Sequence, residues 1–177
     1  MSINTDEFRI DKAGENDAGI IAKFGEKAFN DAFGHLNPPD DHAIYVKKAF
    51  SIDNIRHELK EETNYFYLAH HFDTVFGYIK VKTGAFPTEL KAVSPLELER
   101  IYVDKSLHGK GVGKRLMETC VLHALTHGND AVWLGTWDIN FKAIRFYESH
   151  GFKTIGNRIF VVGNDRQNDV IMAKYLS

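Results

Sequence analysis

The sequence lacks cysteine pairs, long apolar runs and a strong excess of charge, and each shortage excludes a class of protein. The single cysteine, Cys120, rules out an intrachain disulfide framework, and its place in an apolar helical pattern predicts a buried structural thiol. No uncharged apolar stretch approaches the ~20 residues that a membrane-spanning helix needs, and the N-terminus is acidic where a signal peptide is basic. We therefore expect a cytoplasmic protein with no membrane partner.

Charge of one sign is also scarce, because 22 Lys and Arg residues stand against 24 Asp and Glu residues, for a net charge of -2. There is no long basic run of the kind that nucleic-acid-binding proteins use, so a small or cationic partner is favoured. The 44% hydrophobic and 12% aromatic content of the 177 residues suits one core. We expect a single domain that spans residues 1–177 and has one active site.

Hydrophobic periodicity predicts an α/β protein. The expected elements are a strand at 8–13, helices at 17–34, 39–50 and 51–62, a hairpin at 65–71 and 74–83, a strand at 96–103, a helix at 111–126, a strand at 131–137, a helix at 140–150, and an antiparallel pair at 154–162 and 169–176. Strand 131–137 follows a strand–helix crossover, so it should pair in parallel with strand 96–103. The positions expected to be buried are Ile20, Ile21, Phe24, Ala28 and Phe29 in the first helix, and Val112, Leu116, Met117, Cys120, Val121, Ala124 and Leu125 in the fourth.

The most informative stretch is LELERIYVDKSLHGKGVGKRLMETC, residues 96–120, which predicts a strand, a glycine turn and a helix. Because a helix N-terminus exposes unpaired N–H groups and a partial positive charge, this turn predicts a phosphate or pyrophosphate site. A P-loop would need glycine at His108 and Ser or Thr at Arg115. A dinucleotide fingerprint would need glycine at Lys114 and would normally open the first strand–helix unit. Both motifs are therefore excluded.

The turn His108-Gly-Lys-Gly-Val-Gly113 resembles the Gln/Arg-x-x-Gly-x-Gly/Ala turn of the GCN5-related N-acetyltransferase (GNAT) superfamily. A second motif, Asn140-Phe-Lys-Ala143 followed by Phe146-Tyr147 and Gly151-Phe152, is similar to the Asn-x-x-Ala-x-x-Phe-Tyr-x-x-x-Gly-Phe segment of that superfamily. The order of elements also matches over nearly the whole chain. The resemblance implies a mixed, mostly antiparallel sheet of about seven strands flanked by helices, with a splayed parallel strand pair at the coenzyme site.

The resemblance implies acetyl-CoA as the co-substrate. Main-chain groups of the strand before the turn would hold the thioester arm, while the amide N–H groups of the turn would hold the pyrophosphate. His108 departs from the family pattern, which has Gln or Arg there. Lys110, Lys114 and Lys142 can alternatively be solvated surface residues, and Asn140 can alternatively be a helix cap. The implied coenzyme-binding residues are Ile101, Tyr102, Val103, His108, Gly109, Lys110, Gly111, Val112, Gly113, Lys114, Asn140, Lys142 and Ala143.

The same resemblance implies that Tyr147 is the general acid that faces the coenzyme sulfur; the alternative is an ordinary half-buried helix tyrosine. Glu97 and Glu99 lie two apart on a strand, so both should point to one face, which continues with Ile101 and Val103. A carboxylate there can take the ammonium proton through a water or attract the cation, unless the two are simply solvated acids. Glu99 matches the family's acidic position better than Glu97.

The strings LELERIYV, GKR, WLGTW, FNDAF and IMAKYL resemble those of the bacterial PaiA-type polyamine acetyltransferases. This implies a polyamine such as spermidine or spermine as the acceptor. Asp31 in FNDAF, with Glu97 and Glu99, would then bind ammonium groups, although an exposed acid near a helix end is ordinary. A protein N-terminus, a lysine or another small amine remains open as acceptor, as does a coenzyme-binding sensor without turnover. A homodimer is compatible with the resemblance.

The nine histidines raise the alternative of a metal site. His123 and His127 share a helical face, but no acidic ligand accompanies them, and His57-Glu58 lacks the second histidine of an HExxH motif. We therefore expect no metal.

Overall fold

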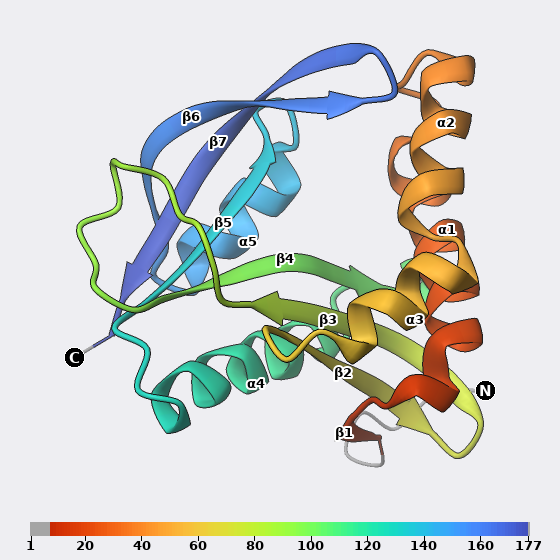
Figure 1. The fold of residues 1–177 in the computed structure, drawn as a ribbon, viewed down its shortest axis with the longest axis horizontal. Helices are drawn as coiled ribbons and strands as arrows, with labels where there is room; N and C mark the ends of the chain where they lie inside the picture. The colour runs from red at the N-terminus through yellow and green to blue at the C-terminus, as the bar shows by residue number, and fades with distance from the viewer. Residues whose placement is uncertain (1–7, 177) are drawn as a thin grey trace.

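One sheet of seven strands is the frame of the computed structural model, which describes residues 8–176 (Figure 1). The strand order is β1-β2-β3-β4-β5-β7-β6, and all neighbours in this sheet pair antiparallel except β4 and β5. The predicted mixed, mostly antiparallel sheet with one parallel pair is confirmed. The strands are β1 (Arg9–Lys12), β2 (Asn64–His71), β3 (Thr74–Lys82), β4 (Pro95–Val103), β5 (Ala131–Trp137), β6 (Lys153–Val162) and β7 (Asp165–Tyr175). The helices are α1 (Ala18–Phe33), α2 (Pro39–Ala49), α3 (Ile52–Lys60), α4 (Val112–Thr126) and α5 (Phe141–Ser149), with short 3-10 turns η1 (Glu15–Asp17) and η2 (Lys105–Leu107).

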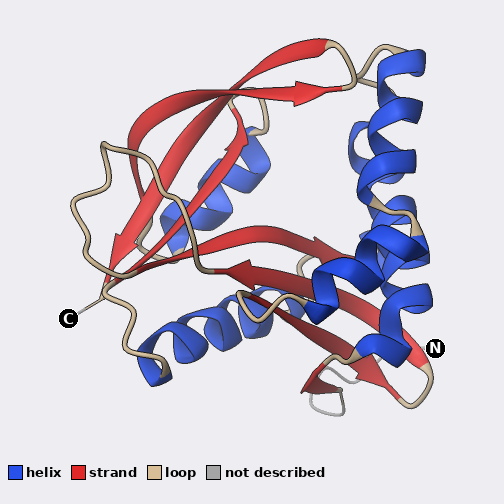
Figure 2. Cartoon of the chain, in the orientation of Figure 1, coloured by secondary structure: helices blue, strands red, loops and turns tan. Residues whose placement is uncertain are grey.

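Helices cover both faces of the sheet (Figure 2). Helix α4 packs on β2, β3 and β4 from one side, and α1 and α3 pack on the same strands from the other. Leu98, Leu116 and Cys120 are buried in the core on the α4 side, whereas Ile21 and Ile55 are buried on the α1 and α3 side. The predicted burial of Cys120 is confirmed, and burial raises the pKa of its thiol to about 12. No helix within residues 8–176 is long and apolar enough to cross a membrane.

The helix starts follow the capping residues that the sequence predicts. Ser51 Oγ accepts a hydrogen bond of 3.2 Å from the N–H of Asn54 at the start of α3, and Pro39 occupies the first turn of α2. Gly111 precedes α4 with a positive φ of 84°, a conformation that glycine adopts without strain. These local signals place each helix within a few residues of its predicted position.

The sheet opens between β4 and β5, as Figure 1 shows. Only three residue pairs join these strands, and the last of them is Glu97 with Trp133. Beyond that pair β4 and β5 separate, so the sheet divides into two arms that share one end. The parallel pairing predicted from the crossover helix is confirmed, and so is the splay that the family resemblance implied.

Contacts between the β6–β7 hairpin and the start of α2, together with the segment just before α2, close the far end of this opening. Asp41 Oδ1 accepts a hydrogen bond of 2.7 Å from the main-chain N–H of Asn164, and Gln167 Nε2 donates to Asn37 Oδ1 at 2.6 Å. We call these four residues the clasp. A Cβ on Gly163 would lie 2.5 Å from the Cα of Asp41, so only glycine allows the hairpin to approach α2 this closely.

Three sequence predictions about the fold were wrong in detail. Strand β7 begins at Asp165, four residues before the predicted start at residue 169. Ile20 is 39% exposed and Leu125 is 51% exposed, although the helical pattern predicted both to be buried. His123 occupies the buried position of α4 instead, where Tyr67 supplies a hydrogen bond of 2.8 Å to its Nδ1. A polar side chain is stable in the core when a partner compensates its lost hydration.

Candidate active site

The turn between β4 and α4 leaves its backbone accessible to an anion. Gly109 and Gly111 have φ values of 77° and 84°, and a Cβ on either would meet no atom within 4 Å. The surface above this turn is therefore open, and the N–H groups of the first α4 turn lie beside it. A Cβ on Gly113 would lie 3.5 Å from Phe146 of α5 and 3.8 Å from Val103 of β4, so three elements converge at this glycine.

His108 links the turn to both β4 and α5. Lys142 Nζ donates a hydrogen bond of 2.9 Å to His108 Nδ1, because an ammonium has only donors. On its other side, His108 Nε2 donates a hydrogen bond of 3.1 Å to the carbonyl oxygen of Val103, because a carbonyl oxygen can only accept. The structure thus brings together two predicted coenzyme ligands. Lys110 and Lys114 stay exposed near the turn, and Lys114 forms a 3.8 Å ion pair with Glu118.

The predicted thioester arm is the outer part of β4. Ile101, Tyr102 and Val103 are half-buried and lie beyond the last β4–β5 pair, so the edge of β4 that faces β5 has no ladder partner there. Asn140 Oδ1 accepts a hydrogen bond of 3.2 Å from the N–H of Ala143 and so caps α5. The capping interpretation of Asn140 is confirmed, and its contact with the coenzyme stays a prediction.

A β-bulge in β4 changes which side chains share a face. Leu98 pairs with Val81 and Arg100 pairs with Lys80, so Glu99 is the extra residue between them. Glu97 and Glu99 do share a face, because both form ion pairs with Lys82. The predicted continuation of that face was wrong. The bulge reverses the alternation, so Ile101 and Val103 pack on the α4 side with Leu98, opposite to the two glutamates.

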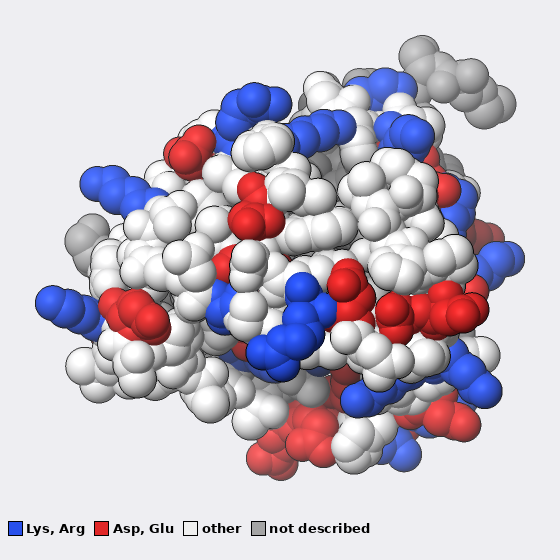
Figure 3. Space-filling view, turned by 90° about the horizontal axis from the view of Figure 1, so that it is seen from above, with Lys and Arg blue, Asp and Glu red and all other residues white. Residues whose placement is uncertain are grey.

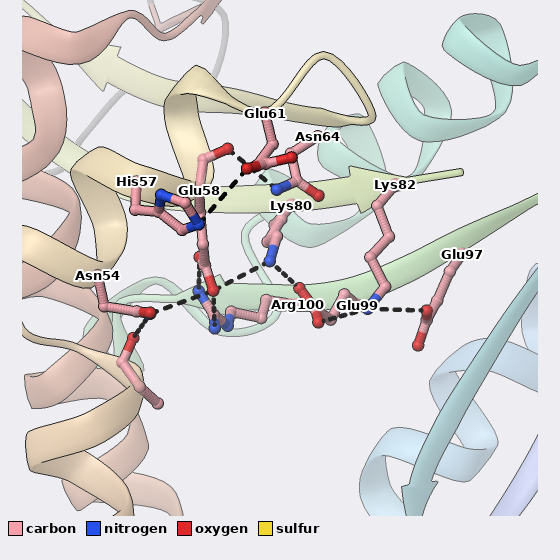
Figure 4. Close-up of polar contacts among 11 residues, drawn as sticks. Asn54, His57, Glu58, Glu61, Asn64, Lys80, Lys82, Glu97, Glu99 and Arg100 are labelled. Atoms are coloured by element: carbon pink, nitrogen blue, oxygen red, sulfur yellow. Dashed lines mark hydrogen bonds and ion pairs between the residues drawn. The ribbon is translucent and has the colours of Figure 1, made fainter. Parts of the chain in front are cut away.

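The glutamates belong to a chain of alternating charges on the α1 and α3 side of the sheet, which we call the ion row (Figure 4). Arg100 donates two hydrogen bonds, of 2.8 and 3.0 Å, to the carboxylate of Glu58 on α3. Lys82 lies 2.9 Å from Glu99 and 3.4 Å from Glu97, which in turn lies 3.6 Å from Arg158. In order of contact, the ion row is Arg100, Glu58, Lys80, Glu99, Lys82, Glu97, Arg158 and Asp169.

The two glutamates have opposite proton affinities. Burial alone would raise the pKa of Glu99, but the charges of Lys80 and Arg100 and the hydrogen bonds from Lys80 and Lys82 outweigh it and lower the pKa to about 2. Burial also raises the pKa of Glu97, and there the opposing charges of Lys82 and Arg158 are too weak to reverse the effect. Glu99 is therefore a weak base fixed as an anion, whereas Glu97 holds a proton more readily.

Tyr147 lies on the opposite side of the sheet from the ion row. Its ring is buried in the α4-side core with Phe152, and its side chain is 8% exposed. Burial raises the pKa of the hydroxyl well above its ordinary range, so the phenol stays protonated at neutral pH. A protonated phenol hydroxyl can donate a hydrogen bond or a proton.

Asp31 is not part of the ion row. It lies on the exposed surface of α1, where Lys27 Nζ donates to it at 2.9 Å, and Lys27 also lies 3.5 Å from Asp104 at the start of η2.

Within residues 8–176, no group of three or more His, Cys, Asp or Glu side chains is arranged to hold a metal ion.

The sequence interpretation missed the basic members of the ion row. Lys80 and Lys82 lie two apart on β3, as Glu97 and Glu99 do on β4, and Lys82 pairs directly with Glu97. These complementary charge patterns on consecutive strands were a usable signal. Arg158 had no such signal. It reaches Glu97 only because β6 lies beyond β7 at the edge of the sheet and sends its side chain across to β5 and β4.

An open glycine turn beside a divided sheet, with a protonated tyrosine on one side and a carboxylate on the other, defines a coenzyme A-dependent acyltransferase. The model of the acetyltransferase (GNAT) family matches residues 27–152, so the chain belongs to this family of N-acetyltransferases, which use acetyl-CoA. An uncharacterized N-acetyltransferase of Lactobacillus delbrueckii subsp. lactis is 32% identical over 168 residues, which cover 95% of this chain and 97% of that protein.

Two solved structures share the fold. The PaiA N-acetyltransferase of Thermoplasma acidophilum, solved in complex with coenzyme A, has a TM-score of 0.76 at 18% identity and covers 96% of this chain and 99% of its own. The ribosomal-protein-S18-alanine N-acetyltransferase of Escherichia coli has a TM-score of 0.70 at 19% identity and covers 96% of this chain and 94% of its own. At these identities the likeness concerns the fold.

Proposed function

We propose that the protein transfers the acetyl group of acetyl-CoA to a primary amine by direct attack in a ternary complex. The observation that carries this proposal is the end of β4–β5 pairing at Glu97, which leaves the β5-facing edge of β4 unpaired from there towards the open glycine turn that follows the strand. Glu97 lies on the α1 and α3 side of the sheet and Tyr147 on the α4 side. In direct attack the amine adds to the thioester carbonyl and loses a proton, and the thiolate that leaves the tetrahedral intermediate gains one, so the reaction needs a base for the amine and a separate acid for the sulfur.

Glu97 is the better candidate for the base. A general base works best when its pKa lies near the operating pH, and burial moves the pKa of Glu97 in that direction. Glu99 was the first choice from the sequence, but its pKa of about 2 makes it a poor proton acceptor. We assign Glu99 to holding Lys80 and Lys82 in place, which keeps Glu97 oriented.

Tyr147 is the proposed acid. Its protonated, buried hydroxyl is placed on the side of the sheet where α4, α5 and β4 converge. Acetyl-CoA supplies the activated thioester when it is bound. The N–H groups of Gly109, Gly111 and Gly113 would hold its pyrophosphate, and the unpaired edge of β4 from Ile101 to Val103 would hold its pantetheine arm. The positive φ values and open space at the turn fit that ligand.

A polyamine is the acceptor that the resemblance to PaiA-type enzymes favours, and it stays a prediction. The PaiA enzyme shares the fold, and so does an enzyme named for the alanine of ribosomal protein S18, so this fold accommodates different acceptors. The ion row is electrically balanced, and acidic and basic side chains also lie next to one another on the face seen in Figure 3. Cytoplasmic location and a homodimer likewise stay predictions.

The test is a steady-state assay of coenzyme A release with a panel of amines, combined with mass spectrometry of the products. Acetylation of at least one small amine by the folded protein would support the proposal. Tight binding of acetyl-CoA without acetylation of any small amine, peptide or lysine would refute it and favour a coenzyme-binding sensor. A Tyr147→Phe variant serves as the low-activity control in the same assay.

A further inference from the structure

The two most exposed side chains of the ion row are cations. The side chains of Lys82 and Arg158 are 34% and 32% exposed, Glu99 beside Lys82 is 25% exposed, and Glu97 and Asp169 are only 8% and 7% exposed. Around Glu97, therefore, the carboxylate lies deeper and the two cations beside it are nearer to solvent. A ligand that enters the opening therefore meets positive charge first, although the row as a whole is balanced.

Arg158 is held in a fixed orientation without using all of its donors. Its guanidinium lies over Gly135 of β5, where an added Cβ would collide with it, and it makes cation–π contacts with Trp133 and Phe160, 5.6 and 5.8 Å from their ring centres. Its contacts with Glu97 and Asp169 measure 3.6 and 3.5 Å, well beyond the ~2.7–2.9 Å of a strong charge-assisted hydrogen bond. A guanidinium has five N–H donors in a planar fork, so several remain for a ligand.

Lys82 lies on the other side of Glu97. Its ammonium is 3.4 Å from Glu97 and 2.9 Å from Glu99, so the proposed base sits between two partly exposed cations. A group that reaches Glu97 from solvent passes both of them. Two or three ammonium groups of a polyamine would be repelled at this position, whereas an anionic substituent next to the reacting amine would be attracted.

We propose that the acetyl acceptor is an amino acid, whose carboxylate binds Arg158 with help from Lys82 while its amino group lies at Glu97. This inference rests on the proposed function and names its substrate class. The planar carboxylate matches the fork of Arg158, and the amine of an α-amino acid is close enough to its carboxylate for Arg158 and Glu97 to be engaged together. A peptide N-terminus has no carboxylate at that position and is therefore a poorer fit.

The experiment compares each amino acid with the amine that lacks only its carboxylate. Phenylalanine is measured against phenethylamine, and lysine against cadaverine, by kcat/KM with the intact protein. In the wild type, we expect kcat/KM to be at least about tenfold higher for the amino acid in each pair, because a charge-assisted contact supports the carboxylate. In Arg158→Gln, the ratio within each pair should move towards one, and in Arg158→Lys it should lie between the two.

Arg56→Gln is the matched control, since Arg56 lies on the surface of α3 with a 3.4 Å ion pair to Asp53, and the ratio should stay at the wild-type value. Equal or higher kcat/KM for cadaverine and phenethylamine in the wild type would overturn the inference and leave the proposed function standing. A carboxylate preference that survives in both Arg158 variants would also overturn it. If no member of any pair is acetylated while another amine of the wider panel is, the inference fails and the proposed function stands; if no amine of the panel is acetylated, the proposed function itself fails.

Discussion

Exchange of Glu99 for glutamine should lower stability in a pH-dependent way. Burial opposes ionisation of Glu99, but Lys80 and Arg100 outweigh it, so the pKa falls from its ordinary 4.5 to about 2 on folding. Since one pKa unit corresponds to ~1.36 kcal/mol, the interval from 4.5 to about 2 corresponds to on the order of 3 kcal/mol. The folded-state pKa is the lower one, so this stabilisation is complete above about pH 4.5 and is lost as the pH falls towards 2.

The assay is urea unfolding of wild type and Glu99→Gln at a series of pH values from neutral to about 2. At neutral pH the variant should unfold with a free energy lower by on the order of 3 kcal/mol. The difference should shrink as the pH falls, because a protonated glutamate and a glutamine make similar interactions. Glu61→Gln is the control: the side chain of Glu61 is 50% exposed and pairs with His57 on the surface, so its change should stay within about 0.5 kcal/mol.

Glu97→Gln should behave in the opposite way. Burial raises the folded-state pKa of Glu97, so the protonated side chain is the form that favours folding. This contribution to stability is fully present at low pH and is lost as the pH rises through the folded-state pKa, where the buried carboxyl ionises. Glutamine removes the cost of this ionisation, and stability at neutral pH should be equal or higher, while kcat falls by about 10²- to 10⁴-fold with the loss of the base. Two results would refute the reasoning: a Glu99→Gln difference that persists at about pH 2, or equal destabilisation by both variants.

Three further changes test other parts of the site. Tyr147→Phe should lower kcat by about 10²- to 10⁴-fold and leave acetyl-CoA affinity unchanged by calorimetry, whereas an unchanged kcat would remove Tyr147 as the acid. Gly111→Ala should lower the free energy of unfolding by about 1 kcal/mol and weaken coenzyme binding, because a φ of 84° strains any residue with a Cβ. The control is Gly19→Ala in α1, where an added Cβ meets open space; it should raise the free energy of unfolding by up to about 1 kcal/mol. Gly135→Ala should displace the Arg158 guanidinium, raising KM for the acceptor without changing coenzyme affinity; a lower acceptor KM would contradict this geometry.

Local signals in the sequence predicted most of the fold. Ser51, Pro39 and the glycines mark helix boundaries through hydrogen bonds and backbone angles that a few neighbouring residues determine. The start of β7 was missed because residues 165–168 are all polar. The Gly163–Asn164 turn, which joins β6 directly to Asp165, was the signal that would have corrected it, since glycine followed by asparagine favours a two-residue hairpin turn.

The site was harder to predict, because its electrostatics depend on side chains from four strands and a helix. Glu97 and Glu99 lie on one strand and share a face, yet folding raises the pKa of Glu97 and lowers that of Glu99. Lys80 and Arg100 face Glu99, whereas the side chain of Glu97 is less exposed to solvent. The bulge at Glu99 is a second reason. Alternation along a strand predicts faces correctly only while the ladder is regular, and no residue in LELERIYV reveals an irregularity by itself.

The order in which the chain is synthesised bears on when the site becomes complete. Strand β7 follows β6 in the chain but is inserted between β5 and β6 in the sheet, and the Asn37–Gln167 hydrogen bond of the clasp joins residues 130 positions apart. A ribosome adds about 5–20 residues per second, so the nascent chain displays an unpaired β5 edge for seconds after the glycine turn has emerged. The proposed acceptor site around Glu97 and Arg158 is therefore complete only after residues 165–175 have been made and inserted between β5 and β6.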